Sequence, residues 1–449
     1  MTAQDVPLPV NGLDSVPTLE LDPLIDDPGT RIIVCCGAGG VGKTTTAAAL
    51  GVRAAERGRR VVVLTIDPAR RLAQSMGIDS LDNVPRKVDG IKGTGGGELH
   101  AMMLDMKRTF DEIVEAHTDP ERARAILENP FYQSLSAGFA GTQEYMAMEK
   151  LGQLRARDAW DLIVVDTPPS RSALDFLDAP KRLGSFLDGR FIKLLMAPAK
   201  MGGRAGMKFL NVGMSMMTGT LGKLLGGQFL KDVQTFVAAM DTMFGGFRTR
   251  ADATYKLLQA PGTAFLVVAT PERDALREAA YFVERLAAEE MPLAGLVLNR
   301  VHGSGAARLS AERARAAAEN LEEGRMVDQA AGKTGERGSR ATSPEPSDIA
   351  TAAARSSHDD QAAPTAAYDT AVQDIEQVQD IEQLTAGLLR LHAERMQVLA
   401  REQRTRDRFT ALHPEVAVAE VAALPGDVHD LAGLRAIGDR LTAGRMPSA

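Results

Sequence analysis

The sequence has few aromatic residues and no excess of positive charge. Tryptophan, tyrosine and phenylalanine make up 4% of the 449 residues, and the formal net charge is −7. Nucleic-acid-binding proteins usually carry a basic surface for the phosphates, and many use aromatic side chains on which the bases stack. The composition therefore argues against this class of protein, and no nucleic-acid partner is expected.

Cysteine is almost absent. The two cysteines, Cys35 and Cys36, are neighbours in a run that reads as a strand. Because neighbouring side chains of a strand point to opposite faces, these thiols can neither bind one metal ion together nor easily form a disulfide. The pair is typical of a reduced cytosolic protein.

Long apolar runs are also missing. A membrane-spanning helix needs about 20 apolar residues, and the nearest candidate, residues 209–230, is interrupted by Asn211, Lys223 and several glycine, hydroxyl and amide residues. The first 30 residues lack the charged start and apolar core of a signal peptide. We therefore expect a cytoplasmic protein, with peripheral contact at a membrane left open, and a disordered tail over residues 1–29.

Short aliphatic runs alternate with segments of helical periodicity. The runs cover residues 31–36, 60–66, 161–166, 264–269 and 293–298, and the helical segments include 44–57, 106–116 and 271–290. Continuous apolar runs are typical of strands buried on both faces, and their alternation with helices predicts an α/β fold with a doubly wound, mostly parallel sheet. Ligands of such sheets bind at the carboxyl ends of the strands.

The composition changes towards the C-terminus. Residues 30–321 are expected to form the core, and residues 322–370 a disordered insertion, because glycine, serine, proline, alanine and charge dominate there. Residues 371–445 are then expected to return to the core as a long charged helix, a strand over 416–424 and a closing helix over 431–441.

A glycine-rich segment with P-loop spacing lies between the first predicted strand and helix. It reads Gly37, Ala38, Gly39, Gly40, Val41, Gly42, Lys43, Thr44, Thr45. Its glycines allow backbone N–H groups to surround an anion, and the helix that begins near Lys43 adds its positive end. We expect Lys43 to contact the β- and γ-phosphates and Thr44 to bind Mg²⁺, so ATP and Mg²⁺ are predicted.

Two aspartates each follow an apolar strand. Asp67 comes after residues 61–66, and Asp166 after residues 162–165. A carboxylate at a strand's carboxyl end faces the ligand crevice of a doubly wound sheet. We assign Asp166 to the Mg²⁺ site and Asp67 to the attacking water. Either aspartate alone could instead cap a surface loop.

These motifs together resemble the ArsA-type ATPases, a deviant Walker A group that includes the tail-anchored-protein targeting ATPase and, more distantly, ParA and MinD. The matching segments are residues 37–45, Asp67-Pro68-Ala69 and Asp166-Thr167-Pro168-Pro169. The likeness covers most of the chain outside residues 1–29 and 322–370. Runs at 101–105 and 175–180 are most similar to an actinobacterial ArsA-like branch.

The resemblance implies a dimeric ATPase whose nucleotide state drives the handling of a hydrophobic or membrane-linked partner. It also implies that Asn299 reads the adenine base and that Pro425 lies beside the base. Two other functions stay open: a ParA- or MinD-like positioning scaffold, and a weakly catalytic regulatory subunit of a heteromer.

Three departures from the family pattern stand out. Ala38 occupies the place of a lysine that reaches across the dimer, so a plain homodimer is expected to hydrolyse ATP slowly. Either Arg70, Arg71 or Arg171 substitutes, or the chain pairs with a paralogue that carries the lysine, which is the hypothesis we favour.

The other two departures concern ligands and clients. The chain lacks the family's Cys-x-x-Cys zinc clamp and its dispersed arsenite-binding cysteines, so neither site is expected. It also reads Ser170-Arg171-Ser172 where the targeting enzymes carry a Thr-Gly-His sequence. The resemblance therefore carries over hydrolysis, but not the identity of a client.

Residues 181–250 are expected to form a helical, methionine-rich lobe. Residues 181–231 hold nine lysines and arginines against one acid, Asp188. The methionines are Met196, Met201, Met207, Met214, Met216, Met217, Met240 and Met243. Three interpretations stay open: an apolar client groove, an amphipathic contact with anionic lipid, and a plain core or dimer interface.

The closing helix carries a regularly spaced apolar face. Its members are Leu431, Leu434, Ile437 and Leu441. We expect this face to pack on the sheet rather than to serve as a MinD-like membrane foot.

Overall fold

The computed structural model describes residues 17–67, 71–93, 95–135, 142–168, 236, 246, 249–334 and 365–443. The predicted methionine-rich lobe lies almost wholly outside these residues. The chain divides into two compact units, one formed by Met1–Val301 and Arg404–Pro447, the other mainly by His302–Gln403. Each unit is described by itself below.

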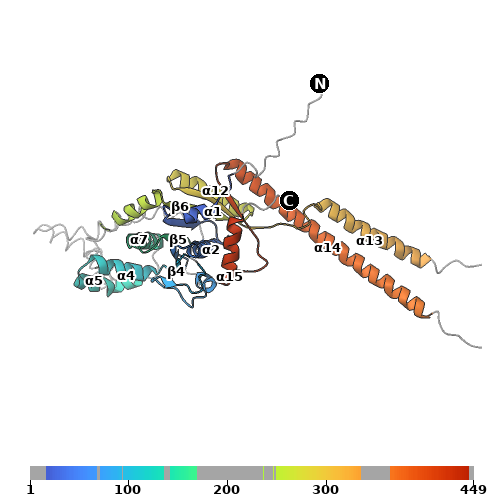
Figure 1. The fold of residues 1–449 in the computed structure, drawn as a ribbon, viewed down its shortest axis with the longest axis horizontal. Coiled ribbons are helices and arrows are strands. Elements are labelled where there is room, and N and C mark those ends of the chain that lie inside the picture. The colour runs from blue at the N-terminus through green and yellow to red at the C-terminus, as the bar shows by residue number, and fades with distance from the viewer. Residues whose placement is uncertain are drawn as a thin grey trace, which may run out of the picture. The chain divides into compact units, whose positions relative to one another are not determined.

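The described residues of the first unit form an eight-stranded sheet (Figure 1), in the order β3-β4-β2-β5-β1-β6-β7-β8. Its strands are β1 (Ile32–Cys36), β2 (Arg60–Thr65), β3 (Arg86–Lys87), β4 (Glu98–Met103), β5 (Leu162–Asp166), β6 (Thr263–Ala269), β7 (Leu293–Val301) and β8 (Val418–Ala422). Neighbouring strands are parallel except for β3 and β4. The predicted fold class, a mostly parallel α/β sheet, is confirmed.

Helices cover both faces of this sheet (Figure 1). Those of the first unit are α1 (Leu21–Asp26), α2 (Lys43–Glu56), α3 (Arg71–Ser75), α4 (Met106–His117), α5 (Pro120–Leu127), α6 (Pro130–Leu135), α7 (Thr142–Ala156), α12 (Arg273–Ala288) and α15 (Leu431–Thr442). Side chains of α1, α2, α3 and α15 share one apolar cluster with the sheet. Those of α4, α5, α7 and α12 share the other. Both faces of the central strands are therefore buried, which accounts for their unbroken aliphatic sequences.

The two cysteines illustrate this double burial. Cys35 belongs to the α2 side of the sheet and Cys36 to the α7 side. The prediction that they point to opposite faces is confirmed, and both are free thiols. Burial raises the pKa of Cys36 to about 12 and the pKa of Cys35 well above its usual range. Neither thiol is therefore prepared to act as a thiolate.

The N-terminal segment differs from its prediction. Residues 17–29 were expected to belong to a disordered tail, but Thr18 pairs with Val418 and α1 follows. Two sets of contacts hold this segment in place. Leu21 and Ile25 of α1 are fully buried, and Asp22 accepts two hydrogen bonds, of 2.6 and 2.7 Å, from Arg53 of α2.

The second unit also corrects a prediction. Residues 322–370 were expected to be a disordered insertion outside a core ending at residue 321. Instead the chain leaves the first unit after Val301, α13 (Ala311–Thr334) extends past residue 322, and α14 (Thr365–Leu412) begins before residue 370. The rest of the predicted insertion, residues 335–364, lies outside the described residues. Alanine, glutamate, arginine and glutamine have high helix propensities, so these segments form helices without many large apolar residues.

Polar contacts join α13 and the loop before it to α14 within the second unit, and Glu322 of α13 accepts a hydrogen bond of 2.5 Å from Arg390 of α14. His392 bonds to the Leu309 carbonyl at 2.8 Å, and Arg395 donates to the Gly303 carbonyl at 2.6 Å. Small buried residues line the same helix pair: Ala314, Ala318, Ala386 and Ala393. The two helices therefore lie side by side as a hairpin, and each buries alanine side chains.

The chain re-enters the first unit through the end of α14 and β8. The predicted strand over 416–424 is observed as β8, which lies beside β7. The closing helix α15 buries Leu434, Ile437 and Leu441 and packs on α2 and β8. Its apolar face is thus used for packing, as expected.

A buried ion pair holds the end of α14 against β8. Glu420 of β8 is 3% exposed and accepts a hydrogen bond from Arg406 near the end of α14. Its second oxygen has no hydrogen-bond partner among the described residues. A buried carboxylate that loses its partner is costly, because it has neither water nor a counter-charge.

We predict that Arg406→Leu lowers the free energy of unfolding by roughly 3–5 kcal/mol, since it strands the Glu420 charge. Urea denaturation of the full chain measures this loss. The double variant Arg406→Leu with Glu420→Leu should recover most of it, because no charge is then left buried. A double variant as unstable as the single one would contradict this account.

Candidate functional site

The P-loop lies at the middle of the sheet, between β1 and α2. Its strand β1 is flanked by β5 on one side and β6 on the other. The chain continues from β1 to β2 on one side of it and later to β6 on the other, so the loop lies at the topological switch point. This is where a doubly wound sheet opens a crevice for ligands.

Two glycines of the loop occupy positions where any larger residue would clash or be strained. Gly37 has φ +148°, and a Cβ there would lie 2.1 Å from the backbone oxygen of Val268 in β6. Gly42 has φ +96° and caps α2, and a Cβ there would lie 2.2 Å from Nδ2 of Asn299. Backbone of the loop thus passes against neighbouring strands at distances that only glycine permits.

Lys43 is held against the loop. Its Nζ donates to the carbonyls of Gly37 at 3.0 Å and Ala38 at 2.8 Å, and the residue is 5% exposed. Burial lowers the pKa of Lys43, while the charges of Asp166 and Asp67 act in the opposite direction. The ammonium group therefore stands where an anion bound by the loop would meet it.

Asp166 ends β5 at the level where β1 and β2 also end. In the sheet register it pairs with Cys35 and with Thr65. Its Oδ2 accepts hydrogen bonds from Thr44 at 2.7 Å and from Thr65 at 2.9 Å. The side chain is fully buried, and burial is the main reason that its pKa rises to about 6.

The donor set at Asp166 fits a magnesium ion. Its Oδ1 is buried and has no hydrogen-bond partner among the described residues, and the Thr44 hydroxyl lies beside the carboxylate. Mg²⁺ prefers carboxylate and hydroxyl oxygens combined with phosphate oxygens. Thr44 and Asp166 would hold the ion, which would offset negative charge on the phosphates of a bound nucleotide.

Asp67 follows β2 directly. Its backbone N–H donates to the Thr65 hydroxyl at 3.2 Å, and its side chain is half-buried. Burial is the main cause of the pKa shifts of Asp166 and Lys43, and the charge of Asp67 makes a smaller upward contribution to the pKa of each. The rest of the predicted switch, Pro68 to Arg70, lies outside the described residues, as does Arg171.

Asn299 lies in β7, near the end of the strand, and Pro425 follows the neighbouring strand β8. Asn299 is buried, and its Nδ2 donates to the Val41 carbonyl of the P-loop at 2.8 Å. Pro425 is exposed in the loop between β8 and α15. The structure thus ties Asn299 to the loop itself, a contact that the sequence did not indicate. The roles of both residues towards a base stay predictions.

Thr65 is a site residue that sequence reasoning missed. It is buried at the end of β2, and its hydroxyl donates to Asp166. The available signal was a hydroxyl at the strand's end after four aliphatic residues, Val61 to Leu64. Such a buried hydroxyl needs a hydrogen-bond partner, and Asp166 supplies it.

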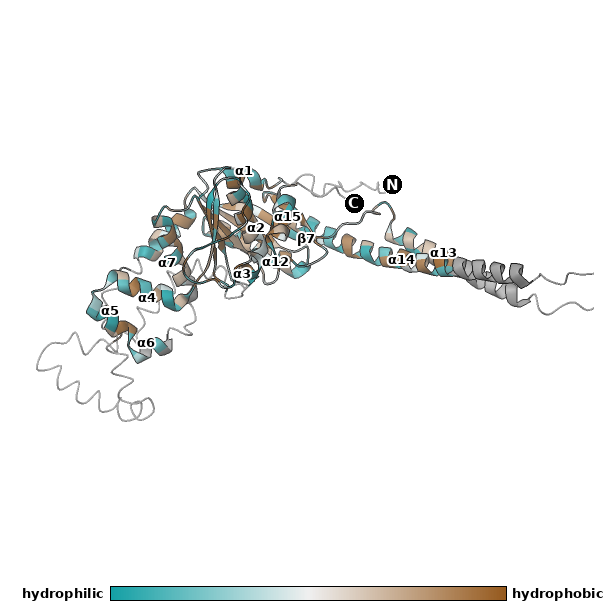
Figure 2. Cartoon of the chain, turned by 60° about the horizontal axis from the view of Figure 1, so that its bottom comes forward, coloured by the Kyte–Doolittle hydropathy of each residue, from teal (hydrophilic) through white to brown (hydrophobic). Residues whose placement is uncertain are grey.

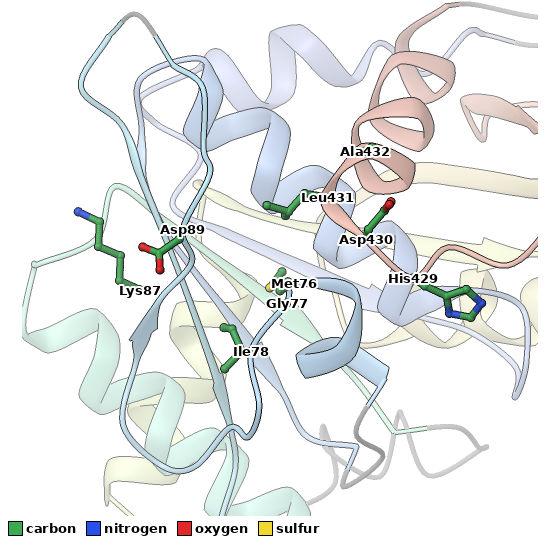
Figure 3. Close-up of a pocket in the computed structure, with 9 residues that line it drawn as sticks. All are labelled: Met76, Gly77, Ile78, Lys87, Asp89, His429, Asp430, Leu431 and Ala432. Atoms are coloured by element: carbon green, nitrogen blue, oxygen red, sulfur yellow. The ribbon is translucent and has the colours of Figure 1, made fainter.

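A cavity of about 400 Å³ lies elsewhere in the first unit (Figure 3). Its lining residues are Met76, Gly77, Ile78, Lys87, Asp89, His429, Asp430, Leu431 and Ala432. None of them belongs to the P-loop or to the strand ends that carry Asp67 and Asp166. The cavity is therefore separate from the phosphate site.

Comparison with known proteins agrees with this geometry. A family model described as "Anion-transporting ATPase" matches residues 30–322. The chain belongs to this family. The resemblance to ArsA-type ATPases is thereby confirmed, and so is the assignment of the chain as an ATPase. Its placement in an actinobacterial branch stays a prediction.

Curated relatives carry ATPase names. "ATPase GET3" of Malassezia globosa is 30% identical over 37% of this chain, and the match spans 47% of that relative, about half of its length. "ATPase GET3" of Podospora anserina is 26% identical over 65% of this chain and 79% of its own. "ATPase ARSA2" of Chlamydomonas reinhardtii is 27% identical over 64% of this chain and 72% of its own length. ATP and Mg²⁺, predicted from the motifs, are consistent with these relatives.

Among the described residues, no helix has the length and apolarity needed to cross a membrane. The expected cytoplasmic location and peripheral membrane contact stay predictions.

We predict that Asn299→Ala weakens binding of ADP and of pyrophosphate to a similar degree, by about two- to tenfold. This range corresponds to one lost hydrogen bond to the Val41 carbonyl, about 1 kcal/mol. Isothermal titration with each ligand measures it, and Asn83→Ala, at a buried asparagine in the loop between α3 and β3, is the control. Weaker ADP binding with unchanged pyrophosphate binding would show that Asn299 acts on the base alone.

Proposed function

We propose that this ATPase is a conformational switch that uses Mg-ATP hydrolysis to handle a hydrophobic or membrane-linked partner. The observation that carries the proposal is the buried carboxylate of Asp166. It connects Thr44 at the start of the P-loop helix to Thr65 at the end of β2. Occupancy of the phosphate site is thereby coupled to the strand that leads directly into Asp67.

The proposed chemistry is attack of water on the γ-phosphorus of ATP. A bond forms from the water oxygen to phosphorus, the bond to the β,γ-bridging oxygen breaks, and ADP and inorganic phosphate leave. Lys43 offsets charge on the phosphates, and Asp67 orients the water. The short distance between Lys43 and the loop carbonyls supports the first role. The position of Asp67 just after β2, at the carboxyl ends of the parallel strands, supports the second.

The partner is proposed from sequence and kinship. Residues 196–243 hold eight methionines among glycines, and methionine offers an adaptable apolar surface. This segment comes after β5 and Asp166 in the chain. A movement at the end of β5 on nucleotide binding would therefore be passed along the chain towards it. The family likeness favours a client groove over a lipid contact or a plain interface. We also propose that the chain acts in the cytoplasm and meets membranes only at their surface.

The proposed assembly is a dimer, with a lysine-bearing paralogue as the second subunit. Ala38 lacks the charge with which the family's lysine reaches a partner's nucleotide. Its side chain is instead 8% exposed and joins the apolar cluster around α2. A cation supplied in trans accelerates related phosphoryl transfers by roughly 10³- to 10⁵-fold. The same observation favours a second candidate, a regulatory subunit that binds nucleotide with little turnover.

We predict a measurable, Mg²⁺-dependent ATPase rate for the purified chain that falls at least tenfold in Asp67→Asn. Rates should be compared at matched nucleotide occupancy, so that a loss reflects chemistry and not binding. Asp79→Asn, an exposed aspartate, is the control and should keep the wild-type rate. Tight ATP binding with negligible turnover in all three proteins would contradict the proposed catalytic switch and favour the regulatory subunit.

The paralogue is tested by mixing. We predict that a lysine-bearing paralogue from the same cell raises turnover at least tenfold, because it supplies the missing cation. The paralogue with that lysine changed to alanine is the control, and should bind without stimulating. Equal turnover with and without the paralogue would contradict the proposed heterodimer.

A further inference from the structure

An apolar stripe runs along the outside of α14 in the second unit. Its members are exposed by 46–65%: Ile381, Leu384, Leu388, Leu391 and Val398. Figure 2 shows apolar, brown segments recurring along this helix. Large aliphatic side chains at this level of exposure are common singly, but a continuous row of them marks an interaction surface.

The stripe is distinct from the face that packs within the hairpin. Ala386 and Ala393, together with the half-buried Leu389 and Met396, form the inner face of α14. At 3.6 residues per turn, the stripe from Ile381 to Val398 lies on roughly the opposite side of the helix. Packing against α13 therefore leaves the stripe uncovered.

The spacing of the stripe is that of a coiled coil. Its steps are three, four and three residues from Ile381 to Leu391, and Val398 follows one heptad later. Arg395 takes the remaining seam position, and its guanidinium turns aside to the Gly303 carbonyl. A 3-4 repeat presents a narrow seam that suits one more helix, whereas a lipid surface favours a broader apolar face.

The seam matches itself when it is read in reverse. In an antiparallel pair centred between Leu388 and Leu391, Ile381 lies opposite Val398 of the second copy, and Leu384 lies opposite Arg395. Leu388 of each copy then lies opposite Leu391 of the other. In such a two-fold arrangement both copies use the same surface, so the dimer is closed and no stripe is left exposed.

The charges of α14 favour the same direction. Residues 373–383 contain four acids and no base, whereas residues 395–408 contain five arginines and two acids. Antiparallel pairing places the acidic end of one helix along the basic end of the other, with Asp380 near Arg401. Parallel pairing would place the two acidic ends together, which opposes association.

The chain's own linker is a poor occupant of the stripe. Residues 335–364 connect α13 to α14 and contain one large aliphatic residue, Ile349. One such side chain cannot cover five. We propose that the stripe on α14 is a self-association surface, on which a second copy of this chain docks its own α14 antiparallel. This surface is independent of the function proposed above.

The test uses the full chain with EDTA and without nucleotide, so that any nucleotide-dependent dimer is not measured. Sedimentation velocity over a concentration series should show self-association of the wild type, and Leu388→Glu with Leu391→Glu should weaken it at least tenfold. The control, Gln383→Glu with Gln397→Glu, changes the same charge on the same helix away from the seam and should retain association. Circular dichroism checks that both variants keep their helix content.

A charge exchange keeps the test decisive even if the glutamates disturb the hairpin. Asp380→Arg and Arg401→Asp should each weaken association, and the double variant should restore it. Weakening without restoration, or association unchanged in every variant, would overturn the proposal.

Cross-linking fixes the direction. A mixture of L388C and L391C chains should form mixed disulfides faster than either variant forms them alone, because these positions face each other only in the antiparallel pair. Faster L388C self-pairing would overturn the antiparallel arrangement.

A monomer whose L388C thiol does not react with a water-soluble maleimide would show that another segment of the same chain covers the stripe. Co-sedimentation of the monomer with anionic vesicles would indicate a membrane, and either outcome overturns the proposal.

Discussion

The site depends on one buried carboxylate, Asp166. It is fully buried, and burial of a lone charge is unfavourable unless hydrogen bonds and opposite charge surround it. Two hydroxyls, from Thr44 and Thr65, donate to one of its oxygens, and the ammonium of Lys43 favours its ionised form. The second oxygen is left without a partner among the described residues. That oxygen is suited to a cation, because a bound cation would satisfy a group that the described residues leave unsatisfied.

This arrangement requires the strands to end in register. Asp166 can meet Thr65 and Thr44 only because β2, β5 and β1 are parallel neighbours, with Asp166 paired to both Thr65 and Cys35. The other side of the loop is fixed by β6 and β7, through the close approach of Gly37 to Val268 and the bond from Asn299 to Val41. Four strands on two sides of β1 therefore shape a single loop. The order of the strands, more than any one residue, makes the phosphate site.

The parts of this fold that the sequence predicts are those with one dominant signal. Central strands buried on both faces must be aliphatic throughout, so β1, β2, β5, β6 and β7 are visible as continuous runs. Asp67 and Asp166 stand out because a carboxylate directly after such a run lies at the ligand-binding edge of the sheet. In contrast, β4 alternates buried and half-buried positions, and its hydropathy is too weak to mark a strand without its neighbours β2 and β3. The structure of residues 17–29 depends on contacts with α2 that are distant in sequence, and no local pattern shows them.

The contact of Asn299 with the P-loop was hidden for the same reason. An asparagine near the end of a strand can bind a ligand, cap a turn or support a neighbouring loop, and which of these it does depends on the order of the strands. The helices that bound the predicted insertion were missed because low hydrophobicity does not by itself exclude a helix. Helix propensity allows α13 and α14 to form with few large side chains, and the hydrogen bond from Arg390 to Glu322 joins them.

The second unit can vary without disturbing the phosphate site. It leaves the first unit after β7 and returns before β8, and these two strands pair directly with each other. The entropic cost of closing a loop grows only slowly with its length, so an excursion between paired strands is tolerated well. The ion pair of Arg406 with Glu420 further anchors the returning chain at β8. Substitutions on the outer stripe of α14 therefore leave both anchors intact, and self-association can be separated experimentally from nucleotide binding.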